Sequence, residues 1–407
     1  MVWRKVKLGD IAEFSNGINF SKDAYSKGVK LIAVSNFGDR FLPEYDLLEE
    51  IKEDVVRNND LLSIGDIVFV RSNGNKELVG RCMLIDNPPD KVTYSGFCIR
   101  ARFKDTTEHD PVFWTYHFKN MAFRRAMSNT AIGANIQNLS QGRLAVYETM
   151  VPDIEGQKRI ANILSAYDNL IKNNQKQIKL LEEAAQRLYK EWFVDLRFPG
   201  YEDSEIVDGV PVGWTKDTLN DYCEIKSGYT FKSRDWQNIG CGVIKIKDIN
   251  NGFVDYSACD CVPPDVAEKA KLYYLRKGDL LIAMTGATIG KIGISTKDGY
   301  YANQRVGKVF LGDNPLERLP FAYCVLSLQS SLEHILNNSS ASSAQPNISG
   351  EKIGDIEIIY SQDTIDKFNS IQQPLFAKMI LLRQNIEKLG KARDLLLPKL
   401  MNGEIEV

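Results

Sequence analysis

Two stretches of the chain repeat hydrophobic residues in alternating steps of four and three. The spacing runs through residues 155–193 and again through the region after residue 362. In an α-helix it places the apolar positions along one narrow stripe, the seam of a coiled coil. We therefore predict two long helices, each of which packs against a partner helix. The seam positions are Ile160, Leu164, Tyr167, Ile171, Asn174, Ile178, Leu181, Ala185, Leu188 and Trp192 in the first stretch, and Phe368, Gln372, Leu375, Met379, Leu382, Ile386, Leu389, Arg393, Leu396 and Leu400 in the second.

Prolines and one asparagine modify this pattern. Because Pro374 has no N–H and its ring crowds the preceding turn, we expect a helix break near Gln372 and Gln373, with Pro374 in the first turn of the longer segment. Pro398 should end that helix. Asn174 lies in the middle of the first seam, where a buried asparagine fixes the register of a helix pair. A solvated position at the edge of the seam is the equally open alternative.

Short β-type runs precede each helical stretch. They are bounded by Gly, Asn, Asp or Pro, which is the pattern typical of strands and turns. Each half of the chain is therefore predicted to hold about 150 residues rich in β-structure, followed by one long helix. The runs lie at residues 31–34, 67–70, 96–103, 242–246, 280–284 and 305–311.

The two halves of the chain resemble each other at an offset of about 210 residues. The offset drifts by only a few residues, which small insertions in loops explain. Four matches in the same order indicate an internal duplication. The aligned segments are residues 11–20 with 222–231, Trp3 with Trp214, residues 64–69 with 277–282, and residues 135–140 with 344–349.

These patterns predict the fold class. We expect an α+β protein with an internal pseudo-twofold repeat: two α/β domains, each followed by a long helix, with the two helices packed as an antiparallel coiled coil. The expected boundaries are 1–152 for the first domain, 153–197 for the central helical spacer, 198–213 for a linker, 214–361 for the second domain and 362–407 for the C-terminal helical spacer.

Four segments carry a resemblance to a known family. They are residues 188–201 (LYKEWFVDLRFPGY), 395–405 (LLLPKLMNGEI), the opening 3–11 (WRKVKLGDI) and 302–306 (ANQRV). Together with the duplicated layout, they make the chain similar to the specificity (S) subunit of type I restriction–modification systems over essentially its whole length.

This resemblance implies a function. Each domain would be a target-recognition domain that reads one half of a bipartite double-stranded DNA target. The helices would set the spacer between the halves and dock two modification (methyltransferase) subunits, which transfer a methyl group from S-adenosylmethionine to adenine N6. Restriction (motor–nuclease) subunits would join for cleavage, with ATP and Mg on the partner subunits. The chain itself is expected to bind no cofactor and not to be an enzyme. A self-sufficient DNA methyltransferase, a nuclease component and a coiled-coil scaffold are the alternatives.

Composition narrows these possibilities only slightly. The 407 residues include 51 Lys and Arg against 53 Asp and Glu, so the net charge of −2 neither indicates nor excludes a cationic DNA-binding face. We find no run of about 18 apolar residues and no secretory leader, so we expect a cytoplasmic protein without a membrane span. The seven cysteines and three histidines are scattered, which favours free thiols over a metal site.

Three motifs were tested for catalysis, and each is incomplete. Asn87-Pro88-Pro89-Asp90 lacks the aromatic residue that an adenine methyltransferase stacks on the flipped base. Residues 286–291 (GATIGK) are one residue short of a phosphate-binding loop and are followed by Ile292 instead of Ser or Thr. Asp217, Glu224 and Lys226 only loosely match a Mg²⁺ nuclease site. We therefore predict neither catalytic nor metal-binding residues.

Candidate DNA contacts were chosen by side-chain chemistry. Major-groove recognition uses Arg or Lys for guanine and Asn or Gln for adenine. Loops that follow apolar strands and collect these residues are therefore candidates, although a solvated polar loop is the alternative for any one of them. The candidates are Lys22, Arg71, Asn73, Asn75, Lys76, Asn135, Gln137, Asn138, Lys232, Arg234, Thr285, Thr288, Lys291, Asn303, Gln304, Arg305, Gln345 and Asn347.

Overall fold

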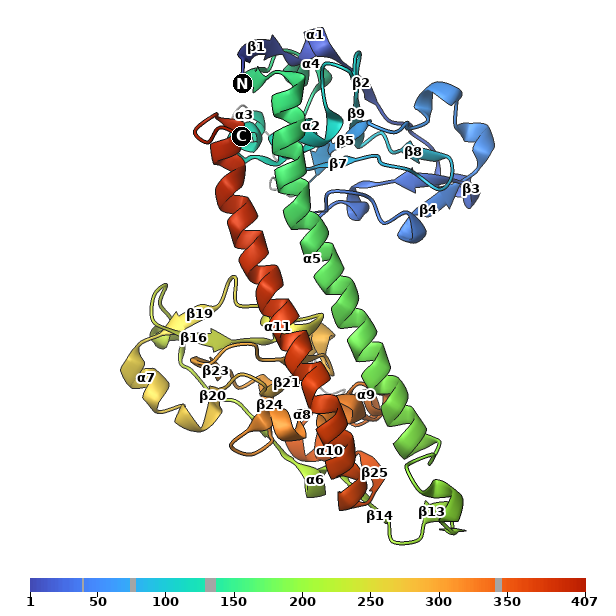
Figure 1. Ribbon diagram of the computed structural model, residues 1–407, viewed down its shortest axis with the longest axis vertical. Coiled ribbons are helices and arrows are strands. Elements are labelled where there is room, and N and C mark those ends of the chain that lie inside the picture. The colour runs from blue at the N-terminus through green and yellow to red at the C-terminus, as the bar shows by residue number, and fades with distance from the viewer. Residues whose placement is uncertain (39, 74–77, 129–136, 341–345) are drawn as a thin grey trace. The chain divides into compact units, whose positions relative to one another are not determined.

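The computed structural model describes residues 1–38, 40–73, 78–128, 137–340 and 346–407. The chain forms two compact units. Unit 1 comprises Met1–Leu170 with Leu389–Val407, and unit 2 comprises Ile171–Lys388. Each unit therefore contains one β-rich part and a portion of both long helices, α5 (Ile154–Tyr189) and α11 (Gln362–Met401) (Figure 1).

Unit 1 is built on a four-stranded antiparallel sheet. Its strand order is β2 (Ala12–Asn16), β9 (Cys98–Phe103), β5 (Ile67–Val70) and β7 (Cys82–Leu84). A second, mixed sheet contains β4 (Glu49–Ile51), β3 (Tyr25–Ile32) and β8 (Val92–Tyr94). The pair β1 (Trp3–Lys7) and β11 (Glu148–Pro152) joins the two ends of the domain. Helices α1 (Leu8–Ile11), α2 (Pro111–Lys119), α3 (Met121–Ser128) and α4 (Gln141–Ala145) complete it.

Unit 2 repeats this order of elements. Its main sheet runs β15 (Glu224–Ser227), β24 (Val306–Phe310), β21 (Leu280–Ala283) and β22 (Ile292–Ile294), and continues into β18 (Gly252–Val254) and β17 (Ile249–Asn250). The second sheet contains β19 (Asp260–Val262), β16 (Cys241–Ile244), β23 (Tyr300–Ala302) and β20 (Tyr274–Leu275), and β14 (Thr215–Thr218) pairs with β25 (Glu357–Tyr360). The helices are α6 (Leu219–Tyr222), α7 (Pro264–Glu268), α8 (Pro315–Leu326), α9 (Gln329–Asn337) and α10 (Gly350–Gly354), and the hairpin β12 (Ile206–Val207) to β13 (Val210–Pro211) precedes them. The predicted internal repeat is confirmed.

A shared turn explains one of the sequence matches between the halves. Before β5 the backbone passes through Gly65 at φ +89°, and before β21 through Gly278 at φ +94°, a region that favours glycine. The buried carboxylates of Asp66 and Asp279 each accept a backbone N–H three residues earlier at 2.7 Å. Each carboxylate also pairs with a cation of the neighbouring strand, Asp66 with Arg102 at 2.6 Å and Asp279 with Lys308 at 3.0 Å. This match therefore has a structural origin.

The two long helices pack on each other as an antiparallel coiled coil, as predicted. In unit 1 the start of α5 and the end of α11 share one core, which contains Ile160, Leu164 and Leu400. In unit 2 the end of α5 and the start of α11 share another, which contains Ala185, Phe368 and Met379. All twenty predicted seam positions are buried or half-buried, and Asn174 is half-buried.

The predicted effect of the prolines is wrong. Helix α11 continues from Gln362 through Pro374 and Pro398 to Met401. Each proline leaves one carbonyl, of Ser370 or Asp394, without its helical N–H donor, but both of those residues are exposed, so water can replace the lost bond. On the opposite face Phe368, Phe376 and Met379 are fully buried, and this packing outweighs the local preference for a break.

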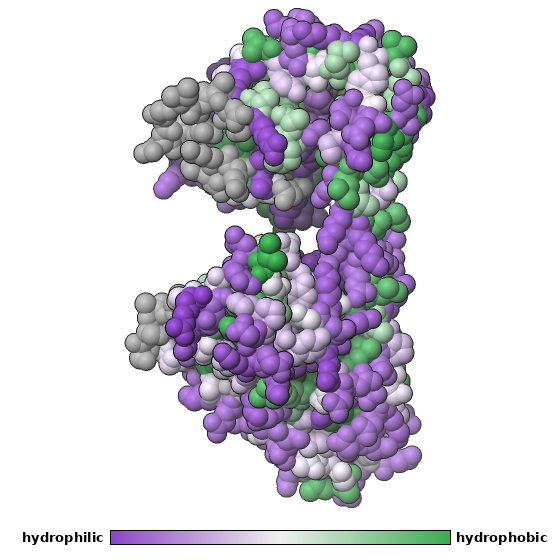
Figure 2. All heavy atoms as spheres, turned by 90° about the vertical axis from the view of Figure 1, so that its left-hand side faces the viewer, coloured by the Kyte–Doolittle hydropathy of each residue, from purple (hydrophilic) through white to green (hydrophobic). Residues whose placement is uncertain are grey.

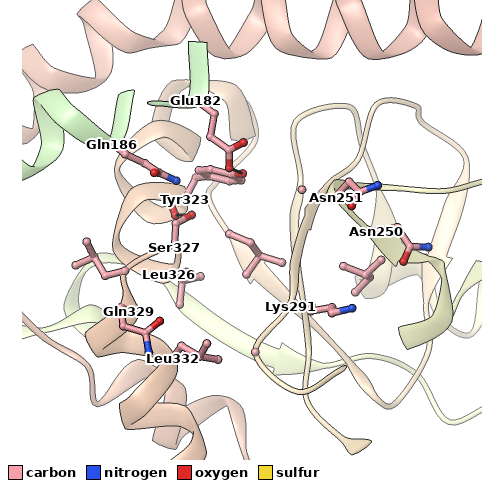
Figure 3. A pocket seen from close by; sticks show the side chains of 15 residues that line it. Glu182, Gln186, Asn250, Asn251, Lys291, Tyr323, Leu326, Ser327, Gln329 and Leu332 are labelled. Carbon is pink, nitrogen blue, oxygen red and sulfur yellow. Dashed lines mark hydrogen bonds between the residues drawn. The ribbon is translucent and has the colours of Figure 1, made fainter. Parts of the chain in front are cut away.

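Matched tyrosines hold each domain to the helices. In unit 1 the Tyr116 hydroxyl donates to Asp168 Oδ2 of α5 at 2.5 Å, and Asp168 also pairs with Arg393 of α11. In unit 2 the Tyr323 hydroxyl donates to Glu182 Oε1 at 2.5 Å (Figure 3). Burial, together with the adjacent carboxylate, raises the pKa of both phenols above its usual range, so each phenol keeps its proton and acts as the donor.

A histidine lies in the aromatic core of unit 1. His117 is 5% exposed, and its ring packs against Trp114 at a centroid distance of 5.2 Å. Neither ring nitrogen has a hydrogen-bond partner among the described residues. Burial lowers the pKa of His117 to about 4, because the apolar surroundings disfavour the imidazolium.

We expect acid to destabilise unit 1 through this histidine. The unfolded chain takes up the proton near pH 6.5 and the folded chain only near pH 4, so the free energy of unfolding falls between these values as the pH decreases. The contribution at pH 4.5 is about 2–3 kcal/mol. Urea titrations at pH 7 and 4.5 should show that His117→Phe loses correspondingly less stability than the wild type, and an unchanged difference between the two pH values would contradict this role.

Candidate nucleic-acid interface

Three segments of unit 1 meet at the end of strand β5. Strand β6 (Ser72–Asn73) follows β5 and pairs with β10 (Gln137–Asn138), so that Gln137 faces Asn73 and Asn138 faces Ser72. The residue between β5 and β6, Arg71, donates its backbone N–H to Phe97 O at 2.8 Å and accepts from Leu139 N at 2.8 Å. We call residues 71–73, the turn 95–98 and residues 137–138 the first candidate surface.

Unit 2 brings the corresponding segments together. Thr285 forms an antiparallel bridge with Asn347. Met284 donates its backbone N–H to Arg305 O at 3.0 Å and accepts from Ile348 N at 3.1 Å. Residues 284–286, the turn 303–306 and residues 346–347 form the second candidate surface.

The central turn of each surface is fixed by the same hydrogen bonds. In unit 1 the bonds run from Gly17 N to Cys98 O (3.1 Å), Ile18 N to Tyr94 O (3.0 Å), Gly96 N to Ile18 O (2.6 Å) and Cys98 N to Ser95 O (2.8 Å). In unit 2 they run from Gly228 N to Val306 O (2.9 Å), Tyr229 N to Ala302 O (2.9 Å), Gln304 N to Tyr229 O (2.9 Å) and Val306 N to Asn303 O (2.8 Å). The two turns therefore correspond residue by residue.

Close packing explains why a glycine faces each turn. A Cβ atom on Gly17 would lie 2.3 Å from the carbonyl oxygens of Tyr94 and Ser95. A Cβ atom on Gly228 would lie 2.3 Å from Ala302 O. Both distances are shorter than a van der Waals contact allows, so only glycine permits the strand to approach the turn.

The third segment of each surface leads into a capped helix. The Ser140 hydroxyl accepts from Arg143 N at 3.2 Å at the start of α4, and the Ser349 hydroxyl accepts from Lys352 N at 3.3 Å at the start of α10. A serine in this position satisfies one of the free N–H groups of the first helical turn. The polar residues that precede the two helices, Asn138 and Asn347, are thereby held in matching places, and both are exposed.

The side chains on the two surfaces differ in availability. Arg71 is half-buried and donates from Nη1 to Gly96 O at 3.2 Å, which leaves further guanidinium N–H groups for an acceptor. Gln304 and Arg305 are exposed, whereas Asn303 is only 8% exposed. Thr285 and Thr288 each have a buried hydroxyl oxygen without a hydrogen-bond partner among the described residues.

Lys291 is not part of the second candidate surface. It lines a cleft of about 370 Å³ in unit 2, together with Glu182 and Gln186 of α5 and Tyr323 of α8. Figure 3 shows the carboxylate of Glu182 directed at Tyr323, with Asn250, Asn251 and Lys291 on the other side of the cleft. The cleft separates the base of the 285–291 loop from the spacer helix.

The remaining candidates fall into two groups. Lys22 in η1 (Lys22–Ala24), and Lys232 and Arg234 at η8 (Ser233–Asp235), are exposed, and no described contact joins them to either surface. Asn75, Lys76, Asn135 and Gln345 lie outside the described residues.

The described residues show neither a metal-binding cluster nor a membrane-spanning helix. Across residues 1–38, 40–73, 78–128, 137–340 and 346–407, we find no group of three or more His, Cys, Asp or Glu side chains placed to hold a metal ion. No helix in this part of the chain combines the length and hydrophobicity of a membrane span. The seven cysteines are free, and burial raises the pKa of Cys82 to about 11 and of Cys98 to about 12, so these thiols stay protonated.

One part of the first surface was not predicted from the sequence. Asn303, Gln304 and Arg305 were chosen as candidates for their side chains. Their counterparts Ser95, Gly96 and Phe97 have different side chains and were therefore not chosen. The matched backbone hydrogen bonds of the two turns identify these counterparts, and the drifting offset between the halves does not show them in the sequence.

Comparisons with known proteins agree with this architecture. The family model described as "Type I restriction modification DNA specificity domain" matches residues 2–183 and again residues 211–389. The type I restriction enzyme MjaIX specificity subunit of Methanocaldococcus jannaschii is 28% identical over 306 residues, which cover 72% of this chain and 68% of that protein. The MjaVIII specificity subunit of the same organism is 25% identical, over 100% of this chain and 93% of that protein.

A solved structure shows the same fold. The S subunit of a type I restriction–modification system from M. genitalium superposes with a TM-score of 0.59 at 18% sequence identity, and the match covers 98% of this chain and 96% of that one. Its coverage, like that of the family model, extends through both halves. The chain therefore belongs to the family of type I restriction modification DNA specificity domains, and it carries two copies of that domain.

Proposed function

We propose that this chain recognises a bipartite double-stranded DNA target, with the first candidate surface reading one half-site and the second reading the other. The family is that of the non-catalytic DNA specificity subunits. The observation that carries the proposal is the matched convergence of three segments at the end of β5 in unit 1 and of β21 in unit 2. Each surface presents arginine and asparagine side chains, which suit guanine and adenine edges in the major groove.

The stiffness of the two surfaces supports a role in recognition. Backbone hydrogen bonds from three separate parts of the chain hold each turn, so that the main-chain positions that carry the side chains are fixed before DNA binds. A rigid scaffold reduces the conformational entropy that binding must overcome.

In addition, the face drawn in Figure 2 shows hydrophilic side chains over most of each unit, with hydrophobic side chains in separate patches.

The coiled coil completes the proposal. We infer that α5 and α11 set the length of the unread DNA between the half-sites and dock two modification subunits, with restriction subunits joining for cleavage. Two reading modules at a fixed separation demand two half-sites at a fixed spacing. In this arrangement S-adenosylmethionine, ATP and Mg are bound by the partner subunits. The domain boundaries that this proposal uses are 1–152 and 214–361 for recognition, 153–197 and 362–407 for the helical spacers, and 198–213 for the linker.

The test is adenine-methylation sequencing of cells that express the intact partner set, with and without this gene. We expect the loss of methylation at one bipartite motif when the gene is removed. Unchanged methylation at every motif would contradict the proposal.

Replacing Arg71, Asn73 and Asn138 together with alanine is expected to relax recognition of one half-site only. Each correct base contact contributes about 1–3 kcal/mol of discrimination, so the methylated motif should lose one or more specified bases in that half. The reciprocal variant, Gln304→Ala with Asn347→Ala, should relax the other half-site and serves as the control. If both variants altered both half-sites equally, the separate roles of the two surfaces would be refuted.

A further inference from the structure

Phe97 occupies the apex of the turn in the first candidate surface. Its residue surface is 61% exposed, while its neighbours Gly96 and Cys98 are buried. Phenylalanine is among the residues most often found inside proteins, and a single exposed one is by itself unremarkable. Phe97 is different because it lies in the central turn of the first candidate surface, where an exposed side chain can reach DNA.

The backbone holds Phe97 rigidly. Its carbonyl oxygen accepts the N–H groups of Arg71 at 2.8 Å and Ser72 at 3.3 Å. The Arg71 guanidinium, in turn, donates to Gly96 O at 3.2 Å, and the Ser95 hydroxyl accepts from Phe97 N at 3.3 Å. The backbone of Phe97 is therefore fixed next to Ser72, which precedes Asn73 and pairs with Asn138, the polar candidates of the same surface.

The corresponding residue of unit 2 has a different chemistry. Arg305 stands at the apex of the matched turn, is exposed, and accepts the backbone N–H of Met284 in the way that Phe97 accepts that of Arg71. The same backbone turn thus carries an aromatic side chain in unit 1 and a guanidinium group in unit 2. In the major groove an aromatic ring suits the methyl group of thymine, whereas arginine suits O6 and N7 of guanine.

We propose that position 97/305 determines base specificity in both copies, with Phe97 making an apolar contact to a thymine methyl group in the first half-site and Arg305 reading a guanine in the second. This inference rests on the proposed function and adds the identity of one specified base in each half.

The experiment begins with the motif that methylation sequencing gives for the wild-type complex. The purified full complex is then titrated with duplexes that carry either thymine or deoxyuracil at each thymine position of the first half-site. The change removes only the methyl group. At one position, on either strand, we expect the wild-type complex to bind the deoxyuracil duplex about fourfold more weakly than the thymine duplex. This factor corresponds to the loss of one buried methyl group.

The Phe97→Ala variant completes a double-mutant cycle, in which one change is in the protein and the other is the removal of the thymine methyl group from the DNA. It should bind the thymine duplex more weakly than wild type and should no longer distinguish thymine from deoxyuracil. Ile64→Ala is the matched control, because Ile64 is 68% exposed and lies before β5, at the opposite end of that strand from Arg71. It should leave the discrimination intact. Arg305→Ala should relax a guanine of the second half-site without affecting the first.

The outcomes separate the two proposals. If the wild-type complex methylates a bipartite motif but Phe97→Ala retains full discrimination between thymine and deoxyuracil, the role of Phe97 is refuted while the proposed function stands. A first half-site without an A·T pair, or an equal loss of affinity for both duplexes in Phe97→Ala, would also overturn the thymine contact. Absence of any methylation that depends on this chain would instead refute the proposed function.

Discussion

Replacing Leu400 and Met401 with alanine is expected to unfold unit 1, although both residues lie at the opposite end of the sequence from the domain that they support. Leu400 is 1% exposed and Met401 5% exposed, and both belong to the hydrophobic core that contains Leu8, Phe113 and Leu164. Truncation of a buried leucine or methionine to alanine typically costs about 2–5 kcal/mol. Two such losses in one core are comparable with the whole stability of a domain, which is about 5–15 kcal/mol.

Hydrogen exchange measured by mass spectrometry locates the effect. Amides of β1, β11 and α2 in unit 1 should exchange faster in the double variant, while those of β21 and α8 in unit 2 should keep their protection. Leu395→Ala is the matched control, since Leu395 lies on the same helix and is 69% exposed. It should change stability by less than about 0.5 kcal/mol. Loss of protection confined to unit 2 would show that the C-terminal helix belongs to a different core.

Phe193→Ala is expected to have the complementary effect and to destabilise unit 2. Phe193 lies in the π-helical turn Lys190–Val194 that follows α5 and is 6% exposed. Its ring lies 5.0 Å from Phe321 and 5.4 Å from Phe368, both in edge-to-face geometry. Loss of a buried phenylalanine costs about 3–5 kcal/mol, and these aromatic pairs add to that figure.

Thermal unfolding combined with hydrogen exchange tests this second expectation. The exchange of α8 and β21 should accelerate in Phe193→Ala, whereas α2 in unit 1 should stay protected. Val194→Ala, at the adjacent and 52% exposed position, should behave like the wild type. Equal stability of the Phe193→Ala and Val194→Ala variants would show that the aromatic cluster contributes little to the stability of unit 2.

The sequence predicted the large-scale organisation because that organisation is periodic. Alternating steps of four and three, maintained over ten positions, predict a helix with one apolar stripe. All positions of the two seams are buried or half-buried in the structure. The duplication was equally visible, since the turns at Gly65-Asp66 and Gly278-Asp279 need the same residues for the same capping bonds. The family prediction was confirmed as well.

The failures have a local and a long-range cause. The break at Pro374 was predicted from a local preference, which the packing of Phe376 and Met379 on the opposite face of α11 overrides. The pairing of Asn73 with Gln137 could not be predicted, because strand partners far apart in sequence have no common periodicity. Phe97 was not predicted because its side chain carries no hydrogen-bonding group, the property on which the candidates depend. The DNA-binding role of every candidate residue stays a prediction.

The division of the chain into units also has a consequence for biosynthesis. Unit 2 consists of residues 171–388, all of which leave the ribosome before the segment Leu389–Val407 that unit 1 needs. At about 5–20 residues per second, the first-made half waits for some tens of seconds with part of its apolar surface uncovered. The half that is translated second can therefore complete its fold first, while the core of the N-terminal half still lacks Leu400 and Met401.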